Sequence, residues 1–142
     1  MRVLGLDVGD RRIGVAVSDA LGLTAQPLAV LTRQSLAADL DVIRTLVDHH
    51  GASAVVVGLP LTLRGERGPQ AEKVVAFTEQ LRRGVAVPIH LIDERLTTVQ
   101  GSRALTEMGV GHKRKKAVVD QVAAQLILQQ FLDLQRHREQ PA

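Results

Sequence analysis

The chain opens with an apolar run that carries one acid, Val3-Leu4-Gly5-Leu6-Asp7-Val8-Gly9. Because it is short and rich in valine and leucine, the run predicts a strand. Residues 12–18 alternate apolar with small side chains and predict a second strand, and residues 24–32 predict a third. The turns between the runs are short, so the three strands should form an antiparallel meander. Pro27 predicts a bulge or an irregular edge in the third.

The rest of the chain alternates between helical and extended patterns. Helical spacing of apolar residues, or a helix-start signal, marks four segments, at residues 35–50, 70–83, 97–109 and 117–138. Two apolar runs, at residues 53–58 and 87–92, predict further strands. Ser35 is a candidate N-cap, Gly51 a candidate stop, and the segment Thr97-Thr98-Val99-Gln100 fits a capping box.

The order of these elements predicts the fold class. Helical crossovers separate the last strands, which should therefore run parallel. We expect an α/β protein in which three antiparallel strands and two parallel additions form a mixed five-stranded sheet flanked by helices. One domain should span residues 1–138, and residues 139–142 should form a disordered tail.

Composition excludes several classes of function. The chain has no cysteine, which rules out thiol catalysis, disulfides and Cys-ligated zinc and is compatible with a reducing compartment. We see no signal peptide and no apolar run of membrane-spanning length, so we expect a cytoplasmic protein without a membrane partner.

Three acidic positions stand in apolar surroundings. Asp7 and the pair Asp93-Glu94 end apolar strands, and Asp120 lies near the start of the last helix. Each acid alone is more simply a cap, a turn former or half of a surface ion pair. Together, acids from separate elements can share the cost of burial by binding hard cations, and oxygen ligands suit Mg²⁺ or Mn²⁺. Such a centre serves phosphodiester chemistry. Alternation allows only one of the pair Asp93-Glu94 to join it.

The basic run His112-Lys113-Arg114-Lys115-Lys116 suggests a polyanionic partner, although a solvated loop explains it equally well. The chain has no tryptophan or tyrosine, so backbone contacts are a better expectation than stacking of bases on aromatic side chains. A rival interpretation rests on Asp7-Val8-Gly9, because Asp-x-Gly before a hairpin also opens actin-like ATPases. Those proteins need two such domains, and this chain has room for one.

The motifs, taken in order, resemble the YqgF family, also called RuvX, of pre-16S rRNA nucleases related to RuvC-type Holliday junction resolvases. The segments that carry the resemblance are Leu6-Asp7-Val8-Gly9, Arg12 to Asp19, Val57-Gly58-Leu59-Pro60, Gly65 to Gly68, Asp93 to Thr98, and Lys115-Lys116 leading into Asp120 and Leu132. The resemblance covers nearly the whole chain. One departure is Thr62, where the family usually has asparagine.

The resemblance implies an RNase H-like fold in which Asp7, Glu94 and Asp120 are the catalytic metal ligands. Phosphate contacts are expected from Arg95, Thr97, Thr98, Lys113, Arg114, Lys115 and Lys116. The implied activity is a Mg²⁺- or Mn²⁺-dependent endonuclease acting on structured nucleic acid, as a monomer or a homodimer. Processing of the 5′ end of pre-16S rRNA is the first candidate. Alternatives are resolution of four-way DNA junctions and a non-catalytic RNA-binding assembly factor.

Overall fold

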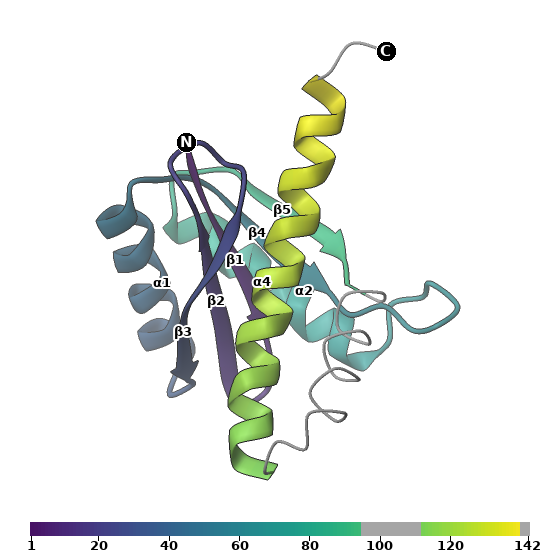
Figure 1. The fold of residues 1–142 in the computed structure, drawn as a ribbon. Helices are drawn as coiled ribbons and strands as arrows, with labels where there is room; N and C mark the ends of the chain where they lie inside the picture. The colour runs from purple at the N-terminus through teal and green to yellow at the C-terminus, as the bar shows by residue number, and fades with distance from the viewer. Residues whose placement is uncertain (95–111, 140–142) are drawn as a thin grey trace.

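The computed structural model describes the backbone of residues 1–94 and 112–139, and the side chains of residues 1–94 and 121–137. Its elements, labelled in Figure 1, are β1 (Arg2–Val8), β2 (Arg12–Ser18), β3 (Ala25–Thr32), α1 (Leu36–His50), β4 (Ala52–Leu59), α2 (Pro69–Gly84), β5 (Ile89–Asp93) and α4 (His112–Glu139).

The five strands form one mixed sheet in the order β3-β2-β1-β4-β5. β1 and β2 pair antiparallel, as do β2 and β3, whereas β4 pairs parallel with both β1 and β5. This arrangement confirms the predicted meander with two parallel additions. It also brings the carboxyl ends of β1, β4 and β5 to the same edge of the sheet.

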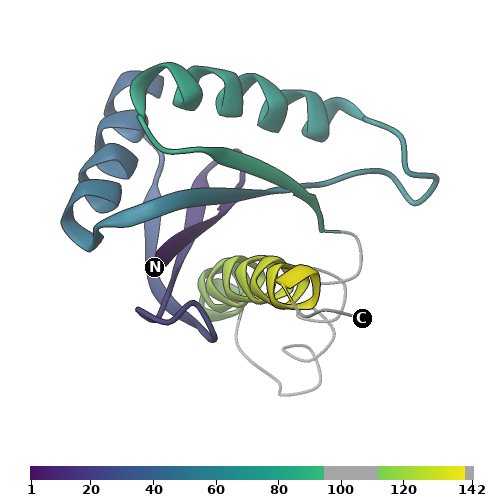
Figure 2. The ribbon, with the colours of Figure 1, turned by 90° about the horizontal axis from the view of Figure 1, so that it is seen from above.

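Helices cover both faces of the sheet, with α1 and α2 on one side and α4 on the other (Figure 2). Alternate residues of β1 divide between the two sides. Leu4, Leu6 and Val8 pack in one core with residues of α1 and α2, while Val3 packs in the second core with α4. Asp7 shares the period of Val3, so its position belongs to the α4 face.

The approach of α4 to the sheet is set by a glycine. A Cβ atom on Gly5 would lie 2.7 Å from Cβ of Leu128 and 3.1 Å from the Ala124 carbonyl oxygen. Only a residue without a side chain allows the helix to lie this close to β1. Leu128 and Ile127 are fully buried there, and burial of each contributes on the order of 2 kcal/mol.

Local signals predicted several element ends correctly. The Ser35 hydroxyl accepts a hydrogen bond from the Ala38 amide at 3.1 Å, and Gly51 ends α1 in the left-handed region at φ 60°. β3 is an edge strand, and its register shifts between Ala29 and Pro27, which face Val15 and Ala16 of β2. The predicted bulge near Pro27 is thus confirmed.

The start of the last helix was predicted too late. α4 begins at His112 instead of about residue 117, so the basic run forms its first turns and is not a loop. Lysine and arginine are good helix formers, and no glycine or proline interrupts the run. The helix also includes Glu139, which we had expected in the tail. The helix predicted at 97–109 lies outside the described residues. Among the helices described, none has the length and apolarity to cross a membrane.

Candidate active site

Asp7 and Glu94 lie on either side of the carboxyl end of β4. Asp7 is on β1, which pairs with β4 through Leu6 and Val57. Asp93, the last residue of β5, pairs with Leu59 at the end of β4. The next amide, that of Glu94, donates a hydrogen bond to the Leu59 carbonyl oxygen at 3.3 Å. The parallel pairing of three strands therefore brings together two acids that are distant in sequence.

The carboxyl groups of Glu94 and Asp7 interact directly. Glu94 is only 6% exposed. Burial raises the pKa of Glu94 to about 8, and the charge of Asp7, a hydrogen bond with the Asp7 carboxyl and the charge of Asp93 add to the rise. Two carboxyl groups can share a hydrogen bond only if one of them holds a proton. Without a cation, the pair therefore holds a proton near neutral pH.

Gly58 makes the space that the Glu94 carboxyl occupies. A Cβ atom on Gly58 would lie 2.4 Å from Oε2 of Glu94 and 2.4 Å from Cδ1 of Ile127. In the sequence, Gly58 ends a valine-rich strand and belongs to the motif Val57-Gly58-Leu59-Pro60, but neither pattern predicts a contact with an acid. Because Gly58 has no side chain, β4 can lie close to the Glu94 carboxyl and to Ile127 of α4.

Asp120 belongs to α4, the helix that packs on β1 through Leu128 and Leu132. Leu132 packs with Val3, and Leu128 packs on Gly5, so one helical turn toward the N-terminus advances two residues along β1. Asp120 lies two turns before Leu128 on the same helix. The side chain of Asp120 lies outside the described part of the structure.

The residues expected to contact phosphates lie in two segments of the chain. Arg95, Thr97 and Thr98 fall outside the described residues. The backbone of Lys113 to Lys116 forms the first turns of α4. Within the side chains described, no cluster of three or more His, Asp or Glu residues is gathered as a metal ion would require.

The donor set of the pair nevertheless suits a hard divalent cation. Asp7 on β1 and Glu94 just after β5 offer carboxylate oxygens, and burial together with the charges of Asp7 and Asp93 disfavours a negative charge on Glu94. A cation would displace the shared proton and neutralise both charges. Mg²⁺ and Mn²⁺ take such oxygen ligands and keep part of their water shell, so two or three carboxylates are enough.

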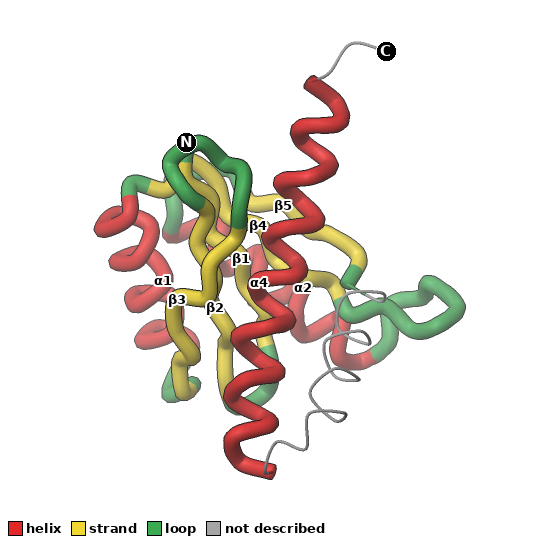
Figure 3. The backbone as a smooth tube through the Cα atoms, in the orientation of Figure 1, coloured by secondary structure: helices red, strands yellow, loops and turns green. Residues whose placement is uncertain are grey.

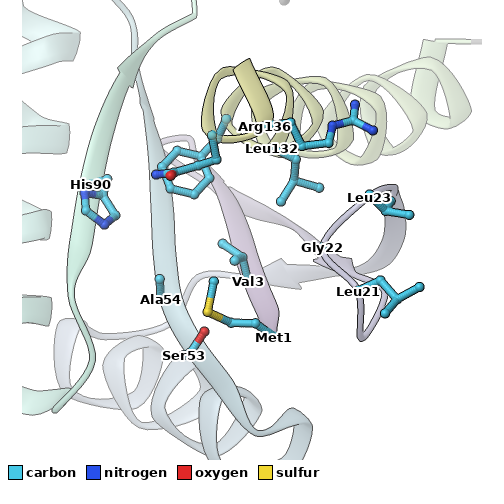
Figure 4. Close-up of a pocket in the computed structure, with 12 residues that line it drawn as sticks. Met1, Val3, Leu21, Gly22, Leu23, Ser53, Ala54, His90, Leu132 and Arg136 are labelled. Carbon is cyan, nitrogen blue, oxygen red and sulfur yellow. The ribbon is translucent and has the colours of Figure 1, made fainter. Parts of the chain in front are cut away.

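A pocket of about 270 Å³ lies at the other end of the sheet (Figure 4). Val3, Leu132, His90 and Arg136 are among the residues that line it. His90 is exposed, and its ring stacks on Phe131 with centroids 5.3 Å apart. Because Val3 and Asp7 lie four residues apart on one strand, about 13 Å separates this pocket from the acids.

Comparison with known proteins identifies the family. The sequence matches RuvX, described as Holliday junction resolvase, over residues 1–134. A protein of Moorella thermoacetica named "Putative pre-16S rRNA nuclease" is 51% identical over 133 residues, which make up 94% of this chain and 95% of the relative. A protein of the same name from Gloeobacter violaceus is 50% identical over 139 residues, 98% of this chain and 88% of the relative.

Solved structures at low identity share the fold. Thermus thermophilus RuvC in complex with a Holliday junction substrate superposes with a TM-score of 0.60 at 17% identity, covering 96% of each chain. The fowlpox virus Holliday junction resolvase gives 0.55 at 10% identity, covering 94% of this chain and 99% of that one. The RNase H-like fold implied by the motifs is thereby confirmed. The family match covers nearly the whole chain, and about half of the residues are identical to those of the Moorella thermoacetica relative. The chain therefore belongs to the RuvX family of nucleases.

Proposed function

We propose that this nuclease is a divalent-metal-dependent endonuclease that hydrolyses phosphodiester bonds in structured RNA, with the 5′ end of pre-16S rRNA as its substrate. The observation that carries the proposal is the Asp7–Glu94 pair, two carboxyl groups held against each other at the carboxyl edge of the sheet. An acid with so high a pKa is costly to ionise without a cation beside it.

Asp7, Glu94 and Asp120 are the proposed ligands of Mg²⁺ or Mn²⁺. The bound ions would supply Lewis-acid stabilisation of the phosphate and an activated water. Glu94 must give up its proton as the metal binds, and the burial supported by Gly58 holds its carboxylate in place. Arg95, Thr97, Thr98, Lys113, Arg114, Lys115 and Lys116 are the proposed phosphate contacts, which position a backbone without reading bases.

Two findings bear on the substrate. The relatives that are about half identical to this chain carry a name that refers to pre-16S rRNA, which favours RNA. The family description refers to Holliday junctions, which keeps a four-way DNA junction as the second candidate. A symmetric junction would be cut most naturally by a homodimer, whereas one active site is enough to cut one RNA strand.

The test is a cleavage assay with wild type, Asp7→Asn and the control Asp10→Asn. Asp10 is an exposed acid in the β1–β2 turn, paired with Lys73 at 3.3 Å, and its loss should be neutral. Substrates are pre-16S RNA with its 5′ leader, a four-way DNA junction and a linear duplex, each with Mg²⁺ or Mn²⁺. We expect Asp7-dependent cutting of the RNA.

The other outcomes separate the alternatives. Symmetric cutting of the junction alone would make the protein a resolvase. Binding of RNA without Asp7-dependent cutting under either metal would make it a non-catalytic assembly factor on a nuclease scaffold. Cutting that persists in a clean Asp7→Asn preparation would remove the assigned centre.

A further inference from the structure

The β4–α2 loop, residues 60–68, projects from the sheet at the carboxyl end of β4 (Figure 3). Its tip carries Leu63, which is 91% exposed. Arg64 and Arg67 beside it are also exposed. A single exposed leucine is common and by itself means little. Three further features set this one apart: the rigidity of its turn, the flanking cations and the neighbouring acids.

The turn that presents Leu63 is held by its own hydrogen bonds. The Gly65 amide donates to the Thr62 carbonyl oxygen at 2.8 Å, which makes Leu63 and Arg64 the central residues of a β-turn. The Thr62 amide donates to the Glu66 carbonyl oxygen at 2.9 Å, and the Glu66 amide donates to the Thr62 hydroxyl at 3.1 Å. Gly65 adopts φ 82°, which glycine allows. The turn therefore holds Leu63 in solvent at little further entropic cost on binding.

Thr62, the position at which the chain departs from the family's usual asparagine, takes part in all of these hydrogen bonds. Thr62 closes the turn with its hydroxyl, its amide and its carbonyl, and its Cγ2 lies 3.2 Å from where a Cβ of Gly68 would be. The Thr62 hydroxyl is therefore used within the loop.

The loop leaves the sheet directly from the candidate centre. The Glu94 carboxyl occupies the space where a Cβ of Gly58 would lie, and the Leu59 carbonyl oxygen accepts a hydrogen bond from the Glu94 amide. Leu63 follows Leu59 by four residues, so at most about 14 Å of chain separates them. An RNA strand bound at the acids is within reach of the loop tip.

We propose that Leu63 is a wedge that inserts where the base stack of the RNA substrate is interrupted, and that Arg64 and Arg67 bind the flanking phosphates. This inference rests on the proposed function and adds a source of selectivity to it. Leucine is one of the side chains that nucleic-acid-binding proteins insert between base steps. A continuous duplex offers no open step, so insertion there requires unstacking, whereas an unpaired site has already lost that stacking.

The experiment measures RNA binding in the Asp7→Asn background, where cleavage does not interfere. The probes are a fully paired RNA hairpin and the same hairpin with two unpaired nucleotides that include 2-aminopurine. Leu63→Ala should weaken binding to the interrupted hairpin about tenfold and reduce the change in 2-aminopurine fluorescence, with little effect on the paired hairpin. Leu63→Met should retain most of the affinity.

Leu21→Ala is the matched control, because Leu21 is 78% exposed and lines the pocket at the other end of the sheet. It should leave both hairpins bound as before. Arg64→Ala and Arg67→Ala should each weaken binding to both hairpins and lower the salt slope by about one. Equal weakening on both hairpins for Leu63→Ala, or none on either, would overturn the wedge. Because binding is measured without cleavage, this experiment tests the role of Leu63 even if the nuclease assay shows no cutting.

Discussion

The Glu94 carboxyl is hydrogen-bonded to the Asp7 carboxyl although β1 and β5, the strands that position them, are not neighbours in the sheet. β4 lies between β1 and β5, and Gly58 at its end has no side chain to keep the two acids apart. The pair therefore depends on the strand order of the whole sheet. A divalent cation bound between the two carboxylates would remove the electrostatic repulsion between them.

Metal affinity should depend on pH through Glu94. The pKa of Glu94 is about 8 in the metal-free protein, and a cation must displace the proton that the pair holds. Affinity for Mn²⁺ should rise about tenfold per pH unit below pH 8 and level off above it. Calorimetry in buffers of different ionisation enthalpy should show release of about one proton at pH 7. Binding that is independent of pH from 6 to 8 would place the metal away from Glu94.

The same pKa predicts how folding stability changes with pH. The pKa of Glu94 is raised from 4.5 to about 8 in the fold, so between these values the folded protein holds a proton that the unfolded chain has released. The contribution of Glu94 to the free energy of unfolding therefore falls as pH rises through this window. Glu94→Gln should flatten that decline in metal-free urea denaturation. Saturating Mn²⁺ should stabilise the wild type and not the variant. A parallel decline in both proteins would contradict the assignment.

Gly58→Ala should lower metal affinity while leaving the fold intact. The new methyl group would meet Oε2 of Glu94 and Cδ1 of Ile127, and the ends of both side chains can move. Displacement of the Glu94 carboxylate should weaken Mn²⁺ binding about 10- to 100-fold, as loss of an outer support for a ligand does elsewhere.

Gly84→Ala is the matched control for this change, because nothing lies within 4 Å of a Cβ at that position. It should leave metal affinity unchanged. Equal Mn²⁺ affinity in Gly58→Ala and wild type, with an unchanged far-UV circular dichroism spectrum, would show that Glu94 tolerates the methyl group and that Gly58 does not position it.

Sequence patterns predicted the features of the fold that depend on residues close together in the chain. The cap at Ser35, the stop at Gly51 and the bulge near Pro27 follow from local backbone chemistry, and all three are present. Short connections fixed the meander for the same reason. The role of Gly58 could not be predicted, because it depends on Glu94 and Ile127, which come close only when β4, β5 and α4 have packed. The start of α4 was missed because charge patterning was taken as a loop signal, although lysine and arginine favour helices.

Gly5→Ala should destabilise the fold by separating α4 from β1. Its Cβ would lie 2.7 Å from Cβ of Leu128, an atom close to the helix backbone that cannot rotate away. We expect a decrease of about 1–3 kcal/mol in the free energy of unfolding, the usual cost of overpacking. Leu128→Ala, which removes the outer part of a buried side chain but keeps its Cβ, should cost about 2–5 kcal/mol. Because the clash is with Cβ, the double variant should show no rescue, and recovery of stability in it would contradict this close approach.

Neutralising the basic run should weaken nucleic-acid binding without unfolding α4. Lys113, Arg114, Lys115 and Lys116 lie in the first turns of the helix, so glutamine, a good helix former, should preserve its backbone. Removing one phosphate-binding cation should lower the slope of log affinity against log salt by about 0.7 to 0.9, so removing all four should lower it by about three. The control is Arg83→Gln, because Arg83 is an exposed cation in the last turn of α2. A salt slope equal to that of the wild type would show that the run is a solvated helix start and that the phosphates bind elsewhere.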